Sequence, residues 1–276
     1  MQVPQDIRDQ VATIDRALAG LPESCTVPVF AERSRYILPI ATGTLVTLAD
    51  EFFLVTAAHA IAAVAREGLP LCVGDLHGAK VFDLREEIIF TRSTSPVDVA
   101  AWRLSTEDVQ LFRHKRFLTL EDLWIFDLDP GAGPFFLRGY LADWQGAAGP
   151  DMPKGFVNSA RIYMSRYREP APVKFYDPPM HLLFTENAQN IFGPNGERLA
   201  LPSSGYDGIS GSGVFVVSLR GHRHRLVAIT TGVHPGAIQG TRVRHLIELI
   251  GSKYPDVQRA IIEFCSTADP RETFLS

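Results

Sequence analysis

Short apolar runs rich in β-branched and aromatic residues, separated by turn residues, fill most of the chain between positions 36 and 231. The two clearest runs, 36–48 and 52–56, flank a polar turn at 49–51 and predict a hairpin. Other runs predict further strands at 71–73, 87–91, 97–104, 135–140, 156–167, 180–184, 214–219 and 226–231. Many short strands without regular alternation with helices favour antiparallel sheets over a parallel α/β sheet.

Helical spacing of apolar residues is strongest near the two ends of the chain. Positions 7–18 predict an N-terminal amphipathic helix, and positions 243–250 and 257–264 predict two closing helices. Two shorter helices are expected between strands, at 58–66 and 105–115. The expected fold class is therefore all-β, with helices at both ends.

Composition narrows the class of protein. The chain has 276 residues, with 27 Lys and Arg against 31 Asp and Glu, a formal charge of −4 and no basic stripe. This argues against a nucleic-acid partner, and no apolar run is long enough to span a membrane. No secretory signal is recognised at the start of the sequence. The three cysteines, Cys25, Cys72 and Cys265, are odd in number and far apart in the sequence, which predicts reduced thiols. The expected location is the cytoplasm.

A serine between glycines is the most informative local pattern. The sequence GISGSG at 208–213 runs directly into the apolar strand VFVV. A nucleophilic serine needs such a sharp turn, because its hydroxyl must protrude while backbone N–H groups face the attacked carbonyl. Ser210 is the expected nucleophile, and Ser212 is the rival within the same motif.

Two upstream segments hold the residue types that would activate this serine. His59 lies in TAAHA at 56–60, after an apolar run, and Asp98 lies in VDVAAWRL at 97–104. A histidine can take the serine proton, and a carboxylate can orient the imidazole. Each residue has a purely structural alternative: His59 as a half-buried residue at a helix start, Asp98 as an acceptor for backbone N–H groups, and Ser210 as an ordinary turn serine.

In their order His59, Asp98, Ser210, these motifs resemble the trypsin-like (chymotrypsin-fold) serine protease family, in a bacterial form without disulfides. The resemblance implies two antiparallel six-stranded β-barrels with an N-terminal helix and C-terminal helices. It divides the chain into an N-terminal helical lead (1–33), a first barrel (34–118), a linker (119–133), a second barrel (134–242), and C-terminal helices with a tail (243–276).

The resemblance also implies roles at the site. His59, Asp98 and Ser210 would form the catalytic triad, and the N–H groups of Gly208 and Ser210 would form the oxyanion hole. Substrate would contact Ser204, Thr230 and Gly232, with an uncharged side chain preferred because Ser204 is not acidic. No cofactor and no metal are expected.

Ile209 departs from many animal relatives, which have an aspartate before the nucleophile. That aspartate pairs with a newly cut N-terminus, so this route of activation is not expected here. Three alternatives stay open: a chain that is active without control, control through the long segment 186–206, and control by a regulatory protein partner. The expected activity is endopeptidase cleavage of a protein or peptide substrate. Two alternatives stay open: a catalytically silent binding or sensor module, and an esterase-type serine hydrolase.

Overall fold

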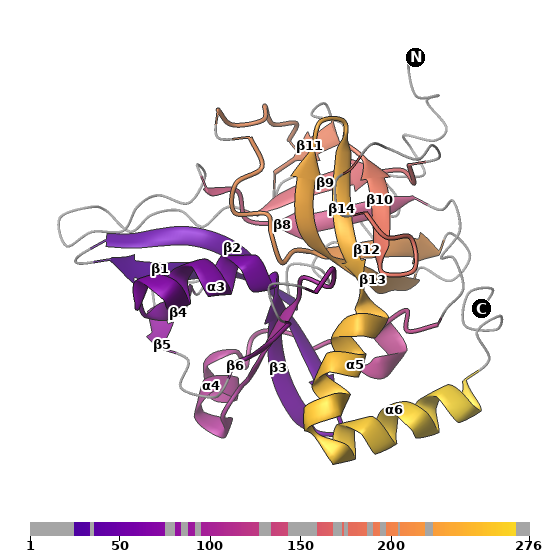
Figure 1. The fold of residues 1–276 in the computed structure, drawn as a ribbon. Coiled ribbons are helices and arrows are strands. Elements are labelled where there is room, and N and C mark those ends of the chain that lie inside the picture. The colour runs from indigo at the N-terminus through magenta and orange to yellow at the C-terminus, as the bar shows by residue number, and fades with distance from the viewer. Residues whose placement is uncertain are drawn as a thin grey trace.

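The computed structural model describes most of the chain and consists mainly of two antiparallel sheets followed by C-terminal helices (Figure 1). The described residues are 25–33, 36–74, 81–83, 88–91, 95–126, 134–142, 159–167, 173, 176–186, 190–193, 197–203, 205–218 and 223–268. The mostly β class expected from the sequence is confirmed. The helix expected at 7–18 lies outside the described residues.

The first sheet has the strand order β5-β4-β1-β2-β3-β7-β6. Its strands are β1 (Thr26–Arg33), β2 (Tyr36–Leu48), β3 (Glu51–Thr56), β4 (Leu71–Gly74), β5 (Val81–Asp83), β6 (Ile88–Phe90) and β7 (Ala100–Arg103). The expected β2–β3 hairpin is confirmed, and Ala49 and Asp50 turn with φ of 51° and 63°. Positive φ at both central residues matches the twist of a tight hairpin.

The second sheet has the strand order β10-β14-β13-β12-β8-β9-β11. Its strands are β8 (Phe135–Gly139), β9 (Ala160–Met164), β10 (His181–Thr185), β11 (Ile191–Phe192), β12 (Gly213–Ser218), β13 (Arg223–His234) and β14 (Ala237–Arg242). The sheet curls, because Thr185 N–H donates to Ser165 O (2.8 Å) and Tyr167 N–H to Leu183 O (3.0 Å). These bonds bring the chain just after β9 alongside β10.

Within the described residues, three short helices lie between strands, and two longer ones follow the last strand. They are α3 (Ala58–Glu67), α4 (Thr106–Leu111), the short 3₁₀ helix η1 (Leu120–Asp122), α5 (Val243–Lys253) and α6 (Pro255–Thr267). Gly68 ends α3 with φ of 66°, and Pro255 starts α6, as expected for these residue types. No helix in the described part of the chain is long and apolar enough to cross a membrane.

One apolar core joins the two sheets. It combines Phe53 of β3, Phe136 and Phe215 of the second sheet, and Leu246 and Ile250 of α5, all buried. Each sheet also has a core of its own, and α3 packs on that of the first sheet. In Figure 1 the yellow helix α5 runs from the end of β14 down beside β3. The shared core fixes the two sheets against each other and thereby sets the geometry of any site between them.

Several features differ from the sequence expectation. The first sheet starts at Thr26, inside the 1–33 segment expected to be a helical lead. The strands β5, β11 and β14 were not expected, the first two because they are only three and two residues long, and β14 because its sequence AIQGTR mixes polar residues and a glycine with two apolar ones. Each sheet has seven strands within the described residues, where six were expected.

Candidate active site

His59 lies in the first turn of α3, and Asp98 supplies the polar cap that this helix lacks in its own sequence. The residue before the helix, Ala57, has no side-chain capping bond. Instead, His59 N–H donates to Asp98 Oδ1 (2.8 Å), and Ala58 N–H donates to Asp98 O (3.4 Å). A carboxylate at a helix N-terminus is stabilised by the free N–H groups there. The same bonds fix Asp98 beside the imidazole.

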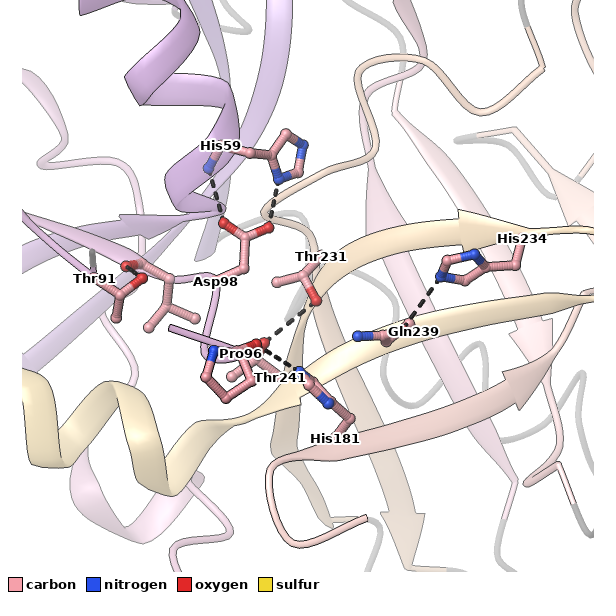
Figure 2. Close-up of polar contacts among 10 residues, drawn as sticks. His59, Thr91, Pro96, Asp98, His181, Thr231, His234, Gln239 and Thr241 are labelled. Atoms are coloured by element: carbon pink, nitrogen blue, oxygen red, sulfur yellow. Dashed lines mark hydrogen bonds and ion pairs between the residues drawn. The ribbon is translucent and has the colours of Figure 1, made fainter. Parts of the chain in front are cut away.

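The His59 ring forms a short contact with the other carboxylate oxygen. Nδ1 and Asp98 Oδ2 are 2.5 Å apart, with the two side chains 51% and 28% exposed (Figure 2). Because a carboxylate only accepts, Nδ1 carries the proton and Nε2 is left as the base. The hydrogen bond to Asp98 raises the pKa of His59, and burial partly opposes this rise. This pairing meets the requirement for a general base that becomes an imidazolium.

A histidine of the second sheet holds the segment that carries Asp98. His181 of β10 accepts Asp177 N–H at Nδ1 (3.0 Å), so its proton lies on Nε2, which donates to Pro96 O (2.9 Å; Figure 2). His181 is 1% exposed, and burial lowers its pKa. His181 was not among the residues expected at the site, and its signal in the sequence is only a histidine at the start of the apolar run of β10. The structure shows it as a link between the sheets.

The Ser210 turn has the tight geometry that its glycines suggested. Gly208 and Gly211 have φ of 88° and 87°, a region that favours glycine. A side chain at Gly211 would collide with the Thr42 carbonyl and the Thr56 hydroxyl. Thr56 ends β3, three residues before His59, so the serine turn lies directly against the strand that leads to the histidine.

Within this turn the two serines differ in accessibility. Ser210 is half-buried, whereas Ser212 is fully buried and its hydroxyl has no partner among the described residues. The described contacts include no hydrogen bond between Ser210 Oγ and the His59 ring. In enzymes without substrate, such bonds are often long and tighten only when substrate binds. Accessibility therefore favours Ser210 over Ser212 as a nucleophile.

Two backbone N–H groups of the turn are available for a ligand. Those of Gly208 and Ser210 donate to no partner within the described residues. The preceding carbonyls are both occupied: Asp207 O accepts Ala142 N–H (2.7 Å), and Ile209 O accepts Ser212 N–H (3.0 Å). In a planar trans peptide the N–H points opposite to the C=O, so both N–H groups face away from these bonds. Such donors can stabilise an oxyanion.

The residues expected to contact substrate lie in different surroundings. Thr230 of β13 is fully buried, and its backbone N–H and C=O pair with Ser212 O (2.8 Å) and Gly211 N–H (2.7 Å). Its observed contacts therefore anchor the serine turn. Gly232 is half-buried, and a side chain there would meet the His234 ring, whose Nε2 contacts Gln239 Oε1 (3.2 Å). Ser204 lies outside the described residues.

The described residues contain neither a candidate metal cluster nor a disulfide. Among the residues that the structure describes, no group of three or more His, Cys, Asp or Glu side chains could hold a metal ion. Cys25 and Cys72 are buried and Cys265 is exposed, and none of the three forms a disulfide.

Comparisons with known proteins add little to this geometry. No family model matches the chain, and no curated protein matches it. One similar solved structure comes from work on aromatic interactions in the coupled folding and binding of the intrinsically disordered VPg protein of Sesbania mosaic virus. It is 12% identical with a TM-score of 0.46, over 84% of this chain and 89% of that one. A similarity this low carries no conclusion about fold or function.

Proposed function

We propose that this chain is a trypsin-like serine endopeptidase that cleaves peptide bonds through His59, Asp98 and Ser210. The observation that carries the proposal is the short His59–Asp98 pair, formed beside a glycine-bracketed serine turn whose Gly208 and Ser210 N–H groups are available. The two-barrel chymotrypsin-like fold belongs to this proposal. The curl of the second sheet and the shared core between the sheets support it.

The chemistry follows from the assigned protons. Ser210 Oγ attacks the scissile carbonyl while His59 Nε2 takes its proton, and Asp98 stabilises the resulting imidazolium. The carbonyl oxygen becomes an oxyanion that the Gly208 and Ser210 N–H groups bind, a contribution of about 3 kcal/mol per donor. His59 then returns the proton to the leaving amine, and water releases the acyl group from Ser210 by the same route.

Substrate selection is proposed to favour an uncharged side chain. Beside Gly232 the structure places His234 and Gln239, and neither is a carboxylate that would attract Lys or Arg. This agrees with the expectation from Ser204.

Covalent labelling with a fluorophosphonate probe tests the proposed nucleophile. The wild-type protein should be labelled, Ser210→Ala should lose the label, and Ser212→Ala should keep most of it because that hydroxyl is buried. Labelling that survives Ser210→Ala would overturn the assignment.

A peptide-library digest then separates the functional classes. Cleavage of internal peptide bonds supports the endopeptidase. Turnover of esters alone would point to an esterase-type hydrolase, and no labelling and no turnover would leave a silent binding module.

A further inference from the structure

Thr42 of β2 lies at the junction between the serine turn and the strand that leads to His59. It is fully buried, and each of its polar groups is used. Its N–H donates to Ser210 O (2.8 Å), and its carbonyl accepts the Thr56 hydroxyl (2.8 Å). Its hydroxyl donates to Gly208 O (3.0 Å) and accepts Tyr140 N–H (2.9 Å). One residue of the first sheet thus contacts both turn residues assigned to the oxyanion hole.

The direction of the hydroxyl bond is fixed by proton count. A threonine hydroxyl has one proton and two lone pairs. Because Tyr140 N–H is a donor, it occupies a lone pair, and the single proton is left for Gly208 O. The Gly208 carbonyl is therefore held towards β2 by a directed bond within a buried site.

Four consecutive peptides of the turn are oriented in this way. Ala142 N–H holds the carbonyl of Asp207, the Thr42 hydroxyl that of Gly208, Ser212 N–H that of Ile209, and Thr42 N–H that of Ser210. Since each trans peptide has its N–H opposite its C=O, fixing the carbonyls fixes the N–H directions. The donor N–H groups of Gly208 and Ser210 belong to the two peptides whose carbonyls Ala142 and Ser212 hold. Thr42 supplies the other two bonds, from the other sheet. It thereby fixes peptide 208–209, which lies between the two donor peptides, and peptide 210–211, which follows the second.

We infer that Thr42 is the positioning residue that braces the oxyanion donors of the Ser210 turn by fixing the peptide that follows each of them, an inference that rests on the proposed function. Ile209 is buried in the core of the second sheet and offers no carboxylate with which an N-terminal ammonium group could pair. The Thr42 hydroxyl bond instead holds the peptide between Gly208 and Ile209, which lies between the two donor peptides. The donors are accordingly formed in the intact chain, without cleavage.

Two pairs of side chains that differ mainly at the hydroxyl position test the Thr42 hydroxyl. Wild type against Thr42→Val, and Thr42→Ser against Thr42→Ala, each differ mainly in the hydroxyl. The fluorophosphonate labelling rate, and kcat and KM for a cleaved peptide, should be measured for all four. Without the hydroxyl, kcat and the labelling rate should fall at least about 10-fold, towards the loss seen on removing an oxyanion donor, with KM unchanged. Thr42→Ser should recover most of the rate.

Thr44→Val is the matched control. Thr44 lies two residues along the same strand and is equally buried. Its hydroxyl donates to Gly211 O (3.2 Å), in a peptide that adjoins neither donor peptide. Its loss should lower stability but leave the labelling rate near that of wild type.

The outcomes separate the two proposals. If wild type is labelled and Thr42→Val is labelled at the same rate, the role of Thr42 is overturned but the proposed protease stands. If Thr42→Val does not fold, equal labelling rates in Thr42→Ser and Thr42→Ala lead to the same conclusion. A parallel rise in KM, or an equal loss in Thr44→Val, shows a merely structural role. A wild type that no probe labels removes the proposed function and this inference with it.

Discussion

His224 lies in the core between the two sheets, where replacing it with leucine should change how stability depends on pH. It is 6% exposed, and the rings of Phe215 and Phe136 are centred 5.6 and 6.4 Å from its own. Neither ring nitrogen has a hydrogen-bond partner within the described residues. Burial lowers the pKa of His224 from 6.5 to about 4, with Asp122 opposing the shift and Arg116 adding to it.

The sign and size of the effect follow from this pKa. Between pH 6.5 and 4 the unfolded chain binds a proton at His224 that the folded chain does not, so stability falls on acidification. At about 1.36 kcal/mol per pH unit, the loss is about 3 kcal/mol in total. About 2 kcal/mol of it is already lost by pH 5.

Urea unfolding at pH 7.5 and at pH 5 measures this loss. His224→Leu should be at least as stable as wild type at pH 7.5, because two unpartnered polar atoms leave the core. Its stability should fall by about 2 kcal/mol less than that of wild type between the two pH values. Leu226→Val trims the same core without a titrating group, so it should lose about 1 kcal/mol equally at both. An unchanged pH dependence in His224→Leu would refute the assignment of a buried neutral imidazole.

Two further predictions concern the residues around Asp98. In a pH–rate profile, the acid limb of kcat/KM should have an apparent pKa above 6.5, because Asp98 raises the pKa of His59 and the base must be neutral. Asp98→Asn should move this limb to lower pH, and an unmoved limb would contradict the pairing. His181→Leu should lower stability by about 1–3 kcal/mol and slow fluorophosphonate labelling, because Pro96 O and Asp177 N–H lose their partner; an unchanged labelling rate would argue against the link.

Local sequence patterns were sufficient for the elements that carry the site. The β2–β3 hairpin, helix α3 with His59 and the glycine-bracketed Ser210 turn depend on residues close together in the chain, so periodicity and turn chemistry revealed them. The choice of Ser210 over Ser212 also agrees with their accessibility.

Contacts between distant segments could not be read from the sequence. The bond from Thr42 to Gly208 joins residues 166 positions apart, and that from His181 to Pro96 joins residues 85 apart. Neither residue stands out locally, since a threonine in a strand and a histidine at a strand start are ordinary. His224 stands between Arg223 and Arg225, which gives no sign of burial, but β13 extends through it and packs it against aromatic rings.

A crystal structure of the fluorophosphonate-treated protein tests the central claim most directly. The proposed site predicts phosphorus bonded to Ser210 Oγ, the phosphoryl oxygen accepting the Gly208 and Ser210 N–H groups, and the His59 ring, still paired with Asp98, beside the adduct. Phosphorus on another residue, or a phosphoryl oxygen turned away from both N–H groups, would contradict it.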